Sequence, residues 1–92
     1  MKKALCGGVE RMIPETRTAL LRLLQEGVEA REKKYSLERD ALNAAKGIKS
    51  IPRFMLKRQR NYVRFLRRGL AQAKRDLDIF KAECREIEEE EA

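Results

Sequence analysis

Histidine and tryptophan are absent from this 92-residue chain, and only two cysteines, Cys6 and Cys84, are present. Without histidine a zinc site would need other ligands, and no recognisable metal-ligand spacing occurs. Nothing supports a disulfide between two cysteines so far apart in sequence, so a reducing compartment is expected. The sequence also lacks a glycine-rich phosphate loop and a nucleophile paired with a base. We therefore expect a protein that is not an enzyme and that binds neither a metal nor a cofactor.

Long apolar runs are also missing, so no segment is expected to span a membrane. The N-terminal residues lack the apolar stretch of a secretory signal. Basic residues near the N-terminus leave a mitochondrial transit peptide open, although Glu10 and Glu15 argue against one. We expect an intracellular protein, either cytoplasmic or mitochondrial.

Proline occurs only at positions 14 and 52, and each suits the first turn of a helix. Between them, the cluster GIKSIP at residues 47–52 is the one helix breaker, and Gly47 suits a helix C-terminus. This punctuation predicts an all-α fold: an antiparallel two-helix hairpin, coiled-coil-like, with a short N-terminal arm at residues 1–12. The single hairpin domain, residues 13–92, would contain a helix at about 14–46, a turn at 47–52 and a helix at about 52–88.

The second predicted helix carries a heptad pattern, in which steps of three and four residues relate Leu56, Gln59, Val63, Leu66, Leu70, Ala73, Leu77, Phe80, Cys84 and Ile87. Nine of these ten residues are apolar, which indicates a coiled-coil seam, and we assign Leu56 to heptad position a. The first helix has a weaker seam because Arg31 and Glu38 occupy two of its d positions. Folding the chain at residues 47–52 pairs residues whose numbers sum to about 101, such as Leu21 with Phe80 and Leu24 with Leu77.

Positive charge is concentrated in residues 53–75, which hold nine Arg or Lys and no Asp or Glu. On the heptad, the e positions of this helix are basic and the adjacent b positions add further cations, while Glu32 is the one opposing acidic residue on the first helix. Such a one-signed strip differs from the mixed surface of a solvated helix and favours an anionic partner, with the RNA backbone as first choice. The candidate nucleic-acid-binding residues are Arg53, Lys57, Arg60, Arg64, Arg67, Arg68, Lys74 and Lys81.

The opposite flank, formed by the g and c positions of both helices, is apolar. Because Tyr62 and Phe65 lie there, they would not stack on bases held by the basic strip, so backbone contacts are expected. Gly27 and Gly69 also fall on this flank and suggest close approach of another backbone. We predict an apolar groove covered by residues 1–12, by a second copy or by another protein. Its candidate protein-interface residues are Leu20, Leu23, Leu37, Met55, Tyr62 and Phe65.

A chain this short and this charged buries little surface, so assembly with a partner is expected to stabilise it. The preferred interpretation is a small non-enzymatic helical subunit of a large assembly, namely a ribosome-like ribonucleoprotein. It would contact RNA or another polyanion through the basic strip and a protein neighbour, or itself, through the groove. The alternative is a coiled-coil adaptor or structural subunit of a protein-only complex (respiratory, secretion or cytoskeletal), with the basic strip against an acidic protein face.

Overall fold

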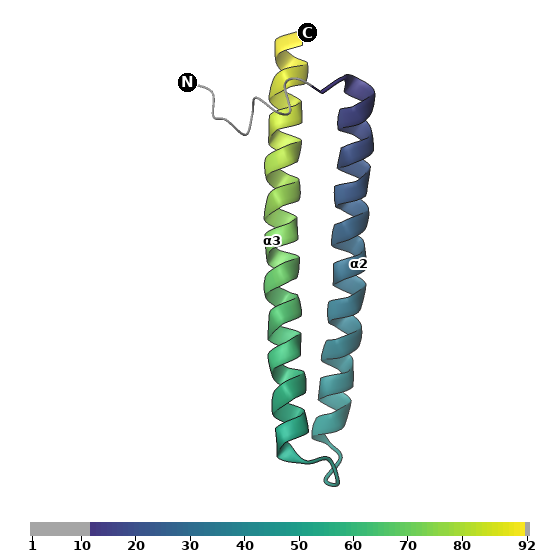
Figure 1. Ribbon diagram of the computed structural model, residues 1–92, viewed down its shortest axis with the longest axis vertical. Coiled ribbons are helices and arrows are strands. Elements are labelled where there is room, and N and C mark those ends of the chain that lie inside the picture. Colours follow the sequence, from purple (N-terminus) through teal and green to yellow (C-terminus); the bar gives the residue numbers. More distant parts are fainter. Residues whose placement is uncertain (1–11, 92) are drawn as a thin grey trace.

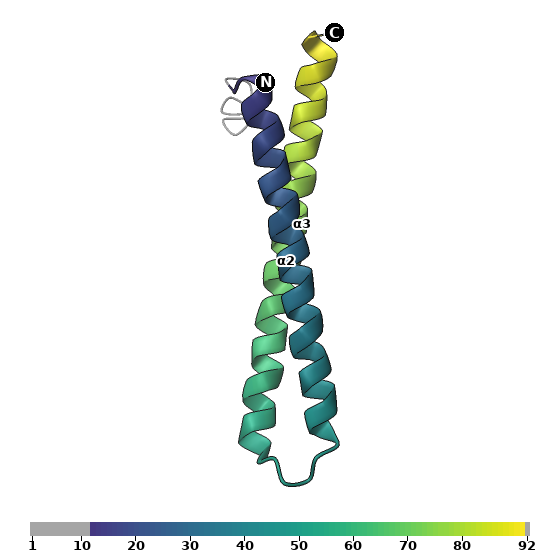
Figure 2. The ribbon, with the colours of Figure 1, turned by 90° about the vertical axis from the view of Figure 1, so that its right-hand side faces the viewer.

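The computed structural model describes residues 12–91, so the predicted arm at residues 1–12 lies outside the described range apart from Met12. Helices α2 (Pro14–Lys46) and α3 (Arg53–Glu91) run antiparallel and form an extended hairpin of 62 × 24 × 15 Å (Figure 1). The two helices cross at a shallow angle near the middle of the hairpin (Figure 2), as expected for a seam that repeats every seven residues. The predicted all-α hairpin is confirmed, and α3 continues beyond residue 88, the expected end.

The two prolines and Gly47 set the ends of the helices. Pro14 occupies the first turn of α2, and α3 starts directly after Pro52, whose carbonyl accepts a hydrogen bond of 3.1 Å from the Met55 N–H. At the end of α2, the Gly47 N–H donates to the Ala44 carbonyl at 3.2 Å, a bond that tightens the last turn. Gly47 has a φ of −84°, so α2 ends there without the left-handed conformation that usually makes glycine useful at this position.

The core is the seam between the helices, and its two clusters of buried residues lie from the middle of the hairpin toward the end where α2 begins and α3 ends. One cluster there contains the buried Phe80, with Leu21 and Leu24 packed against it, and the next contains the buried Leu77, against which the same two leucines pack. Both clusters agree with the predicted register, in which Leu21 lies near Phe80 and Leu24 lies near Leu77. The buried apolar residues are Val28, Leu42, Val63, Leu70, Leu77, Phe80, Cys84 and Ile87, all at a or d positions.

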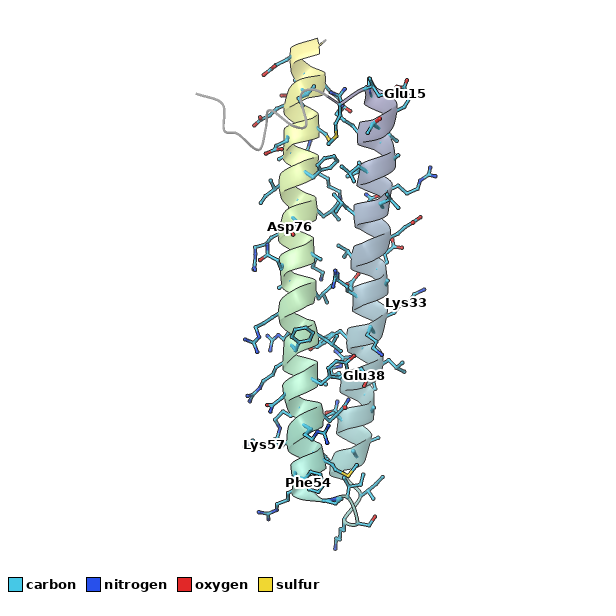
Figure 3. The ribbon with its side chains drawn as sticks, viewed as in Figure 1. Glu15, Lys33, Glu38, Phe54, Lys57 and Asp76 are labelled. Atoms are coloured by element: carbon cyan, nitrogen blue, oxygen red, sulfur yellow. The ribbon has the colours of Figure 1, made fainter. Side chains whose placement is uncertain are left out.

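Toward the turn, one polar pair interrupts the seam, which there also contains the buried Leu42 and Val63. The Gln59 side-chain amide donates to a carboxylate oxygen of Glu38 at 2.9 Å and to its backbone carbonyl at 3.1 Å. In Figure 3, Glu38 lies between the two helices. The Gln59 hydrogen bond, helped by the Lys34 ammonium 3.4 Å away, lowers the pKa of the Glu38 carboxyl. The acidic residue that weakens the α2 seam pattern is therefore matched by the one polar residue of the α3 seam.

Arg17 is an unexpected member of the seam, because its side chain is buried although it is charged. Continuing the α2 heptad back from Leu24 by one repeat places Arg17 at a d position, so the signal was present in the sequence. Its neighbour Cys84 was predicted to be a core residue and is a buried free thiol. Burial raises the pKa of the Cys84 thiol, while the positive charge of Arg17 acts in the opposite direction. Cys6 lies outside the described residues.

Candidate functional site

The eight predicted binding residues, which we call the basic strip, all project from α3. Their side chains are exposed except for that of Lys81, which is half-buried. In Figure 3, Lys57 lies on the side of α3 that faces away from α2. Seven of the eight occupy heptad positions e and b, which are adjacent on the surface of an α-helix beside the apolar seam, and Arg68 occupies the neighbouring f position.

Lys74 is the one member of the basic strip with an ion pair to a carboxylate within residues 12–91. Its ammonium lies 3.4 Å from a carboxylate oxygen of Glu32, and both side chains are about half exposed. Glu32 is the one acidic residue that the heptad pattern places opposite the strip. An exposed pair of this kind contributes little, at most about 1 kcal/mol. The positive charge of the strip is therefore almost uncompensated by the helix beside it.

Four members of the basic strip surround one shallow depression in the surface. Arg53, Lys57, Arg60 and Arg64 line it together with Leu56 and Asn61, and its volume is about 420 Å³. These four positively charged side chains repel one another in the free protein, and binding of a ligand with several negative charges would relieve that repulsion. Arginine guanidinium groups can also donate two parallel hydrogen bonds to a phosphate group. The arrangement suits a polyanion better than a single small anion.

The opposite flank of the hairpin is an exposed apolar surface, as its residue pattern predicts. Leu23 is 63% exposed, and Leu37 and Phe65 are each 65% exposed. Leu20 differs from the prediction, because it is half-buried and packs against the core cluster of Phe80. We call the following set the apolar face: Leu23, Leu37, Met55, Tyr62, Phe65 and Ile79.

Ile79 was not among the predicted interface residues, although it is 53% exposed on this side. It occupies the same heptad position as Phe65, two repeats further along α3, so the pattern alone would have identified it. Phe54 is also exposed but lies on the outer side of α3, outside the apolar face. The apolar face therefore extends along most of the hairpin on the side opposite to the basic strip.

The two glycines of this flank have no role that residues 12–91 explain. A Cβ atom on Gly27 would meet nothing within 4 Å, and one on Gly69 would meet only the Arg31 guanidinium at 3.9 Å. Neither has a positive φ. Each weakens its helix by about 1 kcal/mol relative to alanine. Beside Gly69, a second depression of about 250 Å³ is lined by Ala30, Arg31, Lys34, Phe65, Leu66 and Gly69.

The aromatic side chains of the apolar face are separated from the basic strip by the seam. The Lys34 ammonium lies 6.0 Å from the centre of the Tyr62 ring, on the g side of both helices. The ion pair between Glu32 and Lys74 lies on the e side. A nucleic acid held on the strip would therefore not place its bases on Tyr62 or Phe65, and contacts to its backbone remain the available mode.

Other kinds of site find no support in the part of the chain that the structure describes. No group of three or more Cys, Asp or Glu side chains there could hold a metal ion. Neither α2 nor α3 contains a segment apolar enough to cross a membrane. Comparison with protein-family models, with curated proteins and with solved structures gives no match for this chain.

Proposed function

We propose that this chain is a small non-enzymatic subunit of a ribonucleoprotein-like assembly that binds structured RNA through the basic strip. The observation that carries the proposal is the row of exposed cations on α3, of which only Lys74 has an ion pair within residues 12–91. The apolar face, on the other flank, would contact a protein neighbour. The two surfaces are independent because the seam lies between them.

The spacing of the strip fits the backbone of a nucleic acid rather than its bases. Along the e positions, Arg53, Arg60 and Arg67 recur every seven residues, which is about 10 Å along a helix axis. Lys57 and Arg64 lie between these levels, so the cations form a staggered row. Contacts of this kind give affinity through release of counterions and little sequence preference.

Binding to a fluorescently labelled RNA duplex of about 20 base pairs, measured by anisotropy at several salt concentrations, tests the proposal. If four to six phosphates are neutralised, the plot of log affinity against log salt should have a slope of about −4 to −5. The double variant Arg60→Glu/Arg67→Glu should lower the affinity by at least about tenfold and make that slope shallower by about 2.

A charge-matched control separates the strip from net charge. Lys33→Glu/Lys49→Glu changes the net charge by the same amount, but Lys33 lies on the side of α2 away from α3 (Figure 3) and Lys49 lies in the turn. The control should retain nearly all of the RNA affinity. Equal losses in both double variants, or an affinity that does not change with salt, would refute RNA binding by the strip. Salt-dependent binding to an acidic protein but not to RNA would favour the protein-only adaptor.

A further inference from the structure

Large apolar side chains recur along the apolar face, and no other part of residues 12–91 covers them. Single exposed apolar residues are common on soluble proteins, but an aligned row indicates an interaction surface. On α2, Leu23 and Leu37 are two heptads apart, and on α3, Phe65 and Ile79 are also two heptads apart. All four are more than half exposed.

The pattern of the apolar face is symmetric about its middle. Ala30 lies midway between Leu23 and Leu37, and Gln72 lies midway between Phe65 and Ile79. Because residue numbers paired across the hairpin sum to about 101, these two midpoints lie at nearly the same level. Consider an axis that passes through this level, lies in the plane of the face and is perpendicular to the helices. A rotation of half a turn about this axis exchanges the position of Leu23 with that of Leu37, and the position of Phe65 with that of Ile79. Such a surface is complementary to a second copy of itself.

Charge selects the direction in which the second copy lies. The same half-turn places residues 53–68 of α3, whose charged side chains are all basic, beside the acidic part of the other copy, residues 76–91. Arg58 and Glu86 are both exposed and are equally far from Gln72, so each would lie opposite the other across the interface. A dimer with both turns at the same end would instead place the basic part of α3 over residues 26–48 of α2 in the other copy, which have no net charge, so it lacks this attraction.

We propose that a second copy of this chain packs antiparallel on the apolar face, α2 on α2 and α3 on α3, to form a four-helix bundle. The small residues Gly27, Ala30 and Gly69 lie near the axis, where they would let the two backbones approach closely. The hairpin is 62 Å long and 24 Å wide, so overlap on the order of 1,000 Å² per copy is available, above the roughly 800 Å² of a standard interface. The dimer leaves both basic strips on its outer faces.

The molar mass of the full chain in solution, measured by light scattering and sedimentation equilibrium without RNA, tests this proposal. The expected mass is twice the 10.8 kDa of one chain. Leu37→Glu/Phe65→Glu should raise the dimer dissociation constant at least about 100-fold while keeping the helical circular dichroism, because both side chains are exposed in one copy. The matched control Ile48→Glu/Phe54→Glu changes exposed apolar residues outside the apolar face and should remain dimeric.

Cysteine cross-linking tests the antiparallel direction, with Cys6→Ser as the background. Gln72→Cys places a thiol beside the axis, so mild oxidation should link the two copies at least about tenfold faster than it links Arg68→Cys, which lies on the outer side of α3. Equal cross-linking of both variants overturns the antiparallel arrangement. A chain that stays monomeric at millimolar concentration, or a dimer that Leu37→Glu/Phe65→Glu leaves intact, overturns the proposal.

A second copy of this chain would be the protein neighbour that the proposed function leaves open, and dimerisation can be tested separately from RNA binding. Arg60→Glu/Arg67→Glu should remain dimeric, because neither residue lies on the apolar face. Loss of RNA affinity in that variant with an unchanged dimer mass would support both proposals. A monomeric wild type that binds RNA would overturn the dimer alone.

Discussion

Truncating Leu70 should destabilise the hairpin strongly, whereas truncating Leu37 should not. Leu70 is 8% exposed and packs in one cluster with Val28 and Leu77, while Leu37 is 65% exposed. Leu70→Ala and Leu37→Ala remove the same atoms from helix interiors, so the helix-propensity change is the same in both. The difference between the two variants therefore reports burial in the seam.

The magnitude follows from the burial of each side chain. Losing the buried leucine side chain of Leu70 costs about 2 kcal/mol in transfer free energy, and a cavity adds to this cost. No side chain within residues 12–91 is fully buried, so the site can relax or admit water, and we expect a total of about 2–3 kcal/mol. For Leu37, roughly a third of that surface is covered, and the higher helix propensity of alanine offsets part of the loss, which leaves about 0–0.5 kcal/mol.

Urea denaturation followed by far-ultraviolet circular dichroism measures both values, at a dilution where light scattering shows one chain per particle. Leu70→Ala should also lower the melting temperature by on the order of 10–20 °C, since 1 kcal/mol corresponds to about 4–8 °C in a domain of this size. Equal losses for the two variants at that dilution would refute the assigned seam. A concentration-dependent loss confined to Leu37→Ala would instead report its contact with a second copy.

Two further predictions concern titratable groups of the seam. Because the native state lowers the pKa of Glu38, its contribution to the free energy of unfolding is present above the usual glutamate pKa and is lost as pH falls through the lowered native value. Urea denaturation at several acidic pH values should show this loss in the wild type, and Glu38→Gln, which keeps an acceptor for Gln59, should reduce the pH dependence; an identical profile would refute the assignment. The buried Cys84 has a raised pKa, so in a Cys6→Ser background a thiol reagent should modify it slowly in the native state and rapidly in urea. Equal native and denatured rates would contradict its burial.

Several features of the molecule could be predicted because they depend on residues close together in the chain. Pro14, Gly47 and Pro52 fix the helix ends, since each acts through its own backbone. The heptad assigns each α3 side chain to one side of the helix, and this placed the basic strip and the apolar face on opposite flanks. Ile79 and Arg17 were missed even though the same repeat would have located them.

The sequence by itself determined two long helices, their antiparallel direction and the two chemically different flanks, because helical periodicity and chain reversal are local properties. Tertiary structure decided which polar side chains bond between the helices and which apolar side chain turns inward. Gln59 reaches Glu38, Lys74 reaches Glu32, and Leu20 packs inward instead of lining the apolar face. Each of these depends on how two helices cross and how far a side chain extends, and residues far apart in the chain set both.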